Sequence, residues 1–195
     1  MELVAAVRRR SKKALDLIRS GVDVNVPSAR GETALLWAVI HGDDDLVAAL
    51  LAAGAHPNPR TRGKRGPGNG AAGGTPLHFA TNPGRTGILK QLLAAGAVVD
   101  AADAVGMTPL GAAASIGNVD AVGPLLAAGA QPDLGCPLLM AARAGHVEVV
   151  RALLAAGAQH TPVETLPFPP LRMAIINGHE EVIAVLREVG ARWPL

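Results

Sequence analysis

The sequence predicts an all-α protein, a solenoid of stacked helix–turn–helix units, and three observations lead to this fold class. The motif LLAAGA occurs four times along the 195 residues, with two degenerate copies, LIRSGV and LREVGA. The six glycines that close these motifs recur at intervals of 33, 42, 33, 28 and 33 residues. Aromatic residues make up only 2% of the chain, so small and aliphatic side chains must build the core. These closing glycines are Gly21, Gly54, Gly96, Gly129, Gly157 and Gly190.

The first helix of each unit is predicted to begin at a Thr-Pro-Leu motif and to end at a middle glycine. The motif appears as ETALLWA, GTPLHFA, MTPLGAA, GCPLLMA and PPLRMA. Threonine can cap a helix start, proline at the first helical position loses no hydrogen bond, and glycine is a natural helix C-terminus. The middle glycines, each twelve residues before a closing glycine, are Gly42, Gly84, Gly117, Gly145 and Gly178.

The second helix of each unit is predicted from apolar residues that stand eight, seven, four and three places before the closing glycine. In the fifth unit these residues are Val149, Val150, Leu153 and Leu154. This spacing places all four on one helical face, which must be buried against another element. Each unit is therefore two short amphipathic helices followed by a loop.

The assembled pattern, GxTPLHxAxxxGHxxVVxxLLxxGAxxN, resembles the ankyrin repeat. The clearest copies are Gly74–Ala80 (GTPLHFA) and Ala144–Ala158 (AGHVEVVRALLAAGA), and about six units cover essentially the whole chain. The resemblance implies an ankyrin-repeat solenoid whose hairpin-like loops project to one side. It also implies a role in protein–protein recognition, as a scaffold or interaction module.

We expect a single ankyrin-repeat domain over residues 1–195. The two ends lose apolar character at different positions, as expected if each lacks a different neighbour. Lys13 stands eight residues before Gly21, and Arg187 stands three residues before Gly190. The expected units are an N-terminal cap at 1–28, then 29–59, 72–102, 103–132, 133–165 and a C-terminal cap at 166–195, with an extended basic, glycine-rich loop at 60–71.

Composition and charge indicate which kinds of partner and which cellular compartment to expect. The formal net charge is +2, which gives no overall drive toward nucleic acid or membrane, so any basic site must be local. The single cysteine, Cys136, excludes a disulfide framework and favours a reducing compartment. No secretory signal or membrane-spanning run is visible. We expect a cytoplasmic protein, and the Ala/Gly/Arg/Pro bias hints at a bacterial source.

The histidines and acidic residues that could serve catalysis or metal binding stand at positions where a structural role is expected. His146 and His179 open second helices, and the resemblance implies that His78, in the TPLH motif, ties neighbouring units together. The acidic run Asp43–Asp45 also opens a second helix, where it interacts favourably with the helix dipole. No HExxH, CxxC or nucleophile-elbow spacing occurs. We expect neither an enzyme nor a bound metal or other cofactor.

Asn58–Gly74 interrupts the repeat with a glycine-rich, basic stretch, nine residues longer than the standard loop. It matches neither a Walker A loop nor a dinucleotide-binding loop, because the flanking strands that these need are missing. Three alternatives remain: a tolerated surface insertion, a basic finger for an acidic protein partner, and a phosphate-contacting arm. The last is the least favoured, since no aromatic residue is available to stack on bases.

By matching positions, the resemblance implies contact residues at the loop tips and on the first-helix faces. They mix basic with small apolar groups, which predicts a protein partner with an acidic rim and an apolar centre. We expect a monomer. The rival roles are an antitoxin-like or immunity partner of a toxic enzyme, and a nucleic-acid-associated scaffold. The contact residues are Ala29, Arg30, Glu32, Ile40, His41, Arg60, Arg62, Lys64, Arg65, Asn82, Ala104, Val105, Met107, Ser115, Ile116 and Arg143.

Overall fold

The computed structural model describes residues 1–61, 72–160 and 169–192, and it is all-helical over those residues. Twelve helices and no strand occur in these three ranges, so the predicted all-α class is confirmed. The chain divides into two compact units, Met1–Gly106 and Met107–Leu195.

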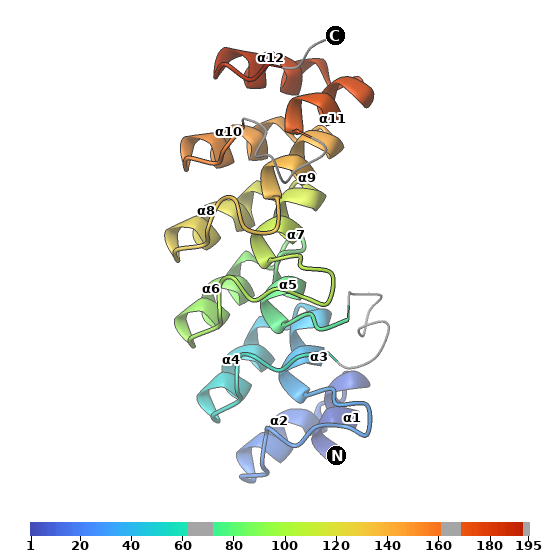
Figure 1. Ribbon diagram of the computed structural model, residues 1–195. Coiled ribbons are helices and arrows are strands. Elements are labelled where there is room, and N and C mark those ends of the chain that lie inside the picture. The colour runs from blue at the N-terminus through green and yellow to red at the C-terminus, as the bar shows by residue number, and fades with distance from the viewer. Residues whose placement is uncertain (62–71, 161–168, 193–195) are drawn as a thin grey trace. The chain divides into compact units, whose positions relative to one another are not determined.

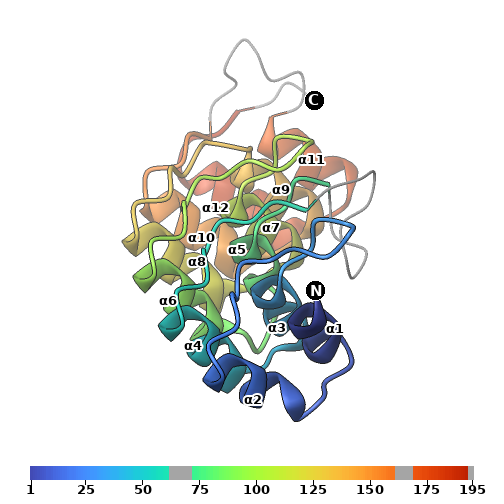
Figure 2. The same cartoon turned by 90° about the horizontal axis from the view of Figure 1, so that it is seen from below.

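The first unit holds three helix pairs. Within it, the first helices of the pairs lie side by side in one row and the second helices in another (Figure 1). The loop between α2 and α3 extends away from both rows (Figure 2). The pairs are α1 (Glu2–Arg8) with α2 (Lys13–Arg19), α3 (Ala34–His41) with α4 (Asp44–Ala52), and α5 (Pro76–Ala80) with α6 (Thr86–Ala94).

The second unit repeats this arrangement with three further pairs. Its first helices, α7, α9 and α11, contact one another in order, and so do α8, α10 and α12 (Figure 1). The pairs are α7 (Pro109–Ile116) with α8 (Val119–Ala127), α9 (Pro137–Ala144) with α10 (Val147–Ala155), and α11 (Pro170–Ile176) with α12 (Glu180–Glu188).

Threonine caps begin several of the first helices, as the Thr-Pro-Leu motif predicts. The Thr33 hydroxyl accepts a hydrogen bond from the Leu36 amide at 3.3 Å, and Thr108 accepts one from Gly111 at 3.1 Å. Thr75 forms a capping box with His78, whose Nδ1 accepts the Thr75 amide at 3.2 Å. Cys136 takes the cap position of α9 with a left-handed backbone, φ 57°, and makes no side-chain cap bond.

The second helices bury the face that the sequence pattern identifies. Val149, Val150 and Leu153 of α10 are at most 1% exposed. Leu154, three residues before the closing glycine, is half-buried at the edge of this face. Burying an aliphatic side chain of this size contributes about 1.5–3 kcal/mol, so the stacked faces supply the main favourable term of folding.

A side chain from one helix pair also caps the first helix of the pair before it. At three positions, the residue that follows a middle glycine bonds a main-chain carbonyl near the end of the first helix of the preceding pair. That carbonyl lies two residues before the middle glycine of its own pair. Arg85 Nη2 donates to the Ile40 carbonyl at 2.7 Å in the first unit. In the second unit, His146 Nε2 bonds the Ser115 carbonyl at 3.3 Å and His179 Nε2 bonds that of Arg143 at 3.0 Å. These bonds satisfy carbonyls that a helix end leaves without an intrahelical partner.

A second set of ties joins each loop to the loop that follows. In the first unit, the Asn25 side chain donates to the Gly54 carbonyl at 2.9 Å and accepts the His56 amide at 2.8 Å. Asn58 makes the equivalent pair with the Gly96 carbonyl at 3.1 Å and the Val98 amide at 2.8 Å. Within the first unit, neighbouring repeats are therefore joined at the turn side and at the loop side.

A pair of glycine substitutions tests the capping tie. An alanine Cβ at Gly117 would lie 2.5 Å from His146 Nδ1, whereas one at Gly129 would meet nothing within 4 Å. Both glycines have positive φ, 76° and 90°, so both substitutions cost about 1–2 kcal/mol in backbone strain. Gly117→Ala must also displace the His146 ring and is expected to lose about 1 kcal/mol more. Urea unfolding of the two variants measures the difference, and equal losses would contradict the role given to His146.

Candidate functional site

The tip of the first loop is a closed turn over residues 28–32. The Ser28 amide donates to the Glu32 carbonyl at 2.8 Å, and the Gly31 amide donates to the Ser28 carbonyl at 2.8 Å. The Ser28 hydroxyl accepts the amides of Arg30 and Glu32, each at 3.2 Å. With so many main-chain groups paired, the turn is rigid. It leaves Ala29 and Arg30, two predicted contact residues, exposed.

Glu32, another predicted contact residue, lies beneath this tip. Its side chain is only 7% exposed, and its carboxylate accepts the Trp37 indole N–H at 3.1 Å and the Ser28 hydroxyl at 3.4 Å. Trp37 in turn lies under the Arg8 guanidinium, 5.3 Å from ring centroid to carbon, and beside the His41 ring at 5.6 Å. Glu32 therefore supports the surface instead of forming it.

Arg8 and Trp37 are the residues of this site that sequence reasoning missed. Trp37 occupies a repeat position shared with Phe79 and Met140, which favours core packing. The structure leaves Trp37 half-buried with its N–H fixed, whereas Phe79 is only 7% exposed. No sequence signal links Arg8 to Trp37, because the two lie in different repeats and the pairing is not repeated.

Hydrogen bonds join the two ends of the second loop, between α4 and α5, at its base. The Thr61 amide donates to the Gly74 carbonyl at 3.0 Å, and the Gly73 amide donates to the Thr61 carbonyl at 3.1 Å. Arg60, a predicted contact residue, is exposed, and its Nη1 donates to the carbonyls of Gly73 at 3.2 Å and Ala102 at 2.7 Å, which gives it a structural role at the loop base. The other basic residues of this predicted contact set, Arg62, Lys64 and Arg65, lie outside the described residues.

The third loop presents an apolar tip. Asp103 accepts the Val105 amide on its carboxylate at 2.9 Å and the Gly106 amide on its carbonyl at 3.2 Å. The Ala104 amide donates to the Ala72 carbonyl at 2.8 Å, which joins this tip to the second loop. Ala104 is exposed and Val105 is 78% exposed, as contact residues must be. Met107, the first residue of the second unit, is half-buried.

The remaining predicted contact residues lie at the ends of first helices. In the first unit, Ile40 and His41 end α3, and Asn82, just beyond α5, donates to the Phe79 carbonyl at 3.0 Å. In the second unit, Ile116 is 43% exposed and Arg143 is exposed, while Ser115 is half-buried. The carbonyls of Ile40, Ser115 and Arg143 accept the capping ties, so only their side chains face outward.

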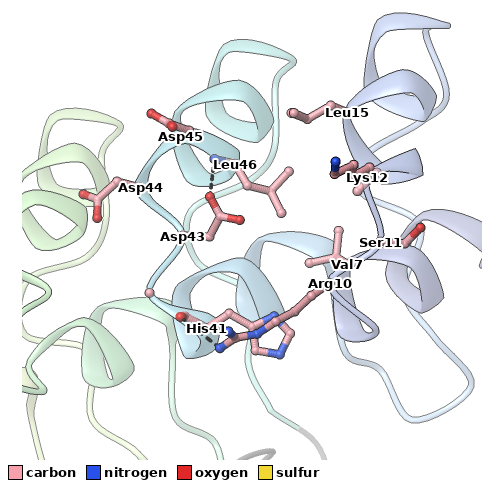
Figure 3. A pocket seen from close by; sticks show the side chains of 12 residues that line it. Val7, Arg10, Ser11, Lys12, Leu15, His41, Asp43, Asp44, Asp45 and Leu46 are labelled. Carbon is pink, nitrogen blue, oxygen red and sulfur yellow. Dashed lines mark hydrogen bonds between the residues drawn. The ribbon is translucent and has the colours of Figure 1, made fainter.

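A hollow of about 580 Å³ lies between the turn after α1 and the turn after α3 (Figure 3). Here the residue after the middle glycine is Asp43, which accepts the Leu46 amide at 3.0 Å and cannot reach back as a donor. Arg10 instead donates from the preceding turn to the His41 carbonyl at 3.4 Å (Figure 3). The reversed tie leaves open the space that Arg85 and the two histidines occupy elsewhere.

Across 1–61, 72–160 and 169–192, no group of three or more His, Cys, Asp or Glu side chains is placed to hold a metal ion. In the same ranges no helix is long and apolar enough to cross a membrane.

Comparison with known families agrees with this architecture. A family model for ankyrin repeats in three copies matches residues 3–103 and 63–135. A second ankyrin-repeat model, for many copies, matches residues 138–187. Together they cover most of the chain, and the protein belongs to the ankyrin-repeat family. Repeats of this family generally mediate protein–protein interaction.

Two curated relatives share the repeat region. The chain is 36% identical over 89 residues to the palmitoyltransferase Hip14 of Drosophila melanogaster and 37% identical over 76 residues to the palmitoyltransferase AKR1 of Candida glabrata. The matches cover 46% and 39% of this chain but only 13% and 9% of those proteins. The chain thus spans a small fraction of the relatives it matches, within their ankyrin regions.

The charges around His41 predict a pH effect. Burial lowers the pKa of His41 below its usual 6.5, Arg10 and Arg85 act in the same direction, and Asp43 opposes them. The folded state therefore favours neutral His41, and its contribution to stability is lost as the pH falls through 6.5 toward the lower folded pKa. Arg10→Gln should raise the pKa of His41 and Asp43→Asn should lower it further, as followed by NMR titration. A shift in the same direction for both variants would refute this account.

Arg60 is expected to control the stability of the loop base. Arg60→Gln cannot span the two carbonyls, so amide hydrogen exchange at Thr61, Gly73 and Ala104 should quicken about fivefold to tenfold. Arg30→Gln is the matched control, because the Arg30 guanidinium bonds no residue in the described ranges. Unchanged exchange in Arg60→Gln would show that the backbone pairs hold the base without it.

Proposed function

We propose that this protein is a non-catalytic scaffold that binds a partner protein through its loop tips and first-helix face. The observation that carries the proposal is that the tips are fixed and yet present unpaired side chains. Val105 is 78% exposed on a loop whose amides are bonded to Asp103 and Ala72. A pre-ordered loop loses little conformational entropy on binding, and an exposed apolar side chain gains from desolvation.

The chemistry of the tips supports a partner with an acidic rim and an apolar centre. Arg30 stands at the first tip, and Val105 at the equivalent place of the third. Because Arg60 holds the loop base, the basic contribution of the insertion is proposed to rest on Arg62, Lys64 and Arg65. Contacts of this kind steer association and set specificity more than they add affinity.

The transferase activity named for the two relatives is not part of this proposal. Their likeness to the chain is confined to ankyrin repeats, and the carboxylate beneath the first tip, Glu32, is already engaged by Trp37 and Ser28. The proposal includes action as a monomer, and action in the cytoplasm, a reducing compartment that the single cysteine favours.

A capture experiment tests the proposal. The tagged protein is incubated with lysate of its native host, beside a variant in which 62–71 is replaced by a short Gly-Ser turn and a variant Val105→Asp. The matched control is Val98→Asp, which alters a 55% exposed valine outside the predicted contacts. We expect Val105→Asp to reduce capture about tenfold and Val98→Asp to leave it unchanged.

The outcomes separate the alternatives. No protein captured by the wild type, or equal capture by Val105→Asp, would overturn the proposed binding face. Capture retained by the 62–71 replacement would make the insertion a tolerated one. Capture abolished by nuclease would favour the nucleic-acid-associated role. A captured enzyme that loses activity on binding would identify an antitoxin-like or immunity partner.

A further inference from the structure

A hollow of about 330 Å³ lies between α1 and the 28–32 loop. Its floor is apolar, because Val4 is 3% exposed and Ala5 stands beside it on the open face of α1. Its loop side is the closed turn described above, whose shape the internal bonds to Ser28 fix. The residues around it are Met1, Val4, Ala5, Arg8, Ser28, Ala29, Arg30 and Glu32.

Two arginines stand at the edge of this hollow with free guanidinium groups. The Arg8 guanidinium contacts the Trp37 ring, 5.3 Å from its centroid, and within the described residues it forms no ion pair. Arg30 is exposed, and its side chain bonds no residue in the part of the chain that the structure describes; its backbone amide donates to the Ser28 hydroxyl. Stacking orders the planar guanidinium without using up its capacity for a bidentate carboxylate contact.

Two acidic groups lie nearby, and within the described residues neither forms an ion pair with these arginines. Glu32 bonds only uncharged donors among these residues, so the hollow carries two arginines against one carboxylate. Glu32 is 7% exposed, and its carboxylate accepts from the Trp37 indole and the Ser28 hydroxyl. Glu2, on the same helix as Arg8, is paired with Lys13 at 2.6 Å. The hollow therefore combines an apolar floor with a positively charged edge.

We propose that this hollow is the anchor subsite for the partner and takes an acidic peptide segment. An aliphatic side chain lies over Val4 and Ala5, and the carboxylate of a neighbouring Asp or Glu pairs with Arg8, with Arg30 adding attraction from the loop side. This inference rests on the proposed function, because it places the acidic, apolar partner chemistry at one defined point of the binding face.

The probe is a set of nine-residue peptides with acetylated and amidated ends. One series carries Asp or Glu beside Leu, a second carries Asn or Gln in place of the acid, and a third carries Lys. Binding is followed by fluorescence anisotropy and by the Trp37 indole N–H resonance, which is one of two tryptophan signals in the chain. We expect only the acidic series to bind and to shift the Trp37 signal.

Charge-matched variants locate the contact. Arg8→Gln should weaken binding of the acidic peptides at least about tenfold, as expected for the loss of a charge-assisted pair. Arg9→Gln removes the same charge from an exposed neighbour outside the hollow and should change binding less than about twofold. Arg30→Gln changes a residue of the loop and not of the helix. It therefore tests the charged edge of the hollow even if Arg8→Gln disturbs α1.

Several results would overturn the inference. These are no binding by any acidic peptide, equal loss with Arg8→Gln and Arg9→Gln, or binding by the Lys series, which would point to Glu32 and a basic partner. Partner capture from lysate separates the two proposals. If the wild type and Arg8→Gln capture a partner equally, the subsite is wrong and the binding function stands. If the wild type captures none, the function itself fails.

Discussion

The rest of the structure depends on the hydrogen bond that joins the end of a first helix to a side chain of the next repeat, which is made at α3, α7 and α9. A two-helix unit of this size cannot bury its own apolar face, so it is stable only against a neighbour. The donors Arg85, His146 and His179 reach the carbonyls at the preceding helix end at 2.7, 3.3 and 3.0 Å. The bond has a direction and a fixed length, so it sets the register in which the non-directional apolar faces meet.

This register also positions the loops of the proposed binding face. In the first unit, Asn25 and Asn58 each fasten one loop to the following one. The junction between the α1–α2 pair and the α3–α4 pair also has such a bond, but the donor comes from the opposite side. Asp43 cannot donate, so Arg10 supplies the tie in the opposite sense, from a left-handed backbone at φ 53° that glycine holds in the later turns.

The periodic part of the molecule could be predicted from the sequence, and the non-periodic contacts could not. Helix pairs and the buried face of Val149, Val150 and Leu153 follow from spacing that recurs in every unit. Arg60 appears in sequence as one more basic residue of an insertion, yet it bonds a carbonyl 42 residues away. Glu32 appears as a contact residue, yet it lies beneath the surface because an indole five positions on takes its carboxylate. Such pairings occur once, so no repetition reveals them.

At the loop tips, the side chains proposed for recognition are different from the groups that hold the fold together. Within the described residues, four tips turn through a glycine of positive φ, between 74° and 82°, at Gly31, Gly73, Gly106 and Gly135. The residue just before that glycine differs every time: Arg30, Ala72, Val105 and Leu134. The ties between neighbouring repeats at these residues use main-chain carbonyls, since those of Ala72 and Leu134 accept the Ala104 amide and the Thr108 hydroxyl. Because the backbone of the turn satisfies its own hydrogen bonds, the side chain at this position can change without cost to the stack. Under the proposed function, partner choice is carried by a few positions that the fold leaves open, and the charged edge of the hollow at Arg8 extends the same principle onto a helix.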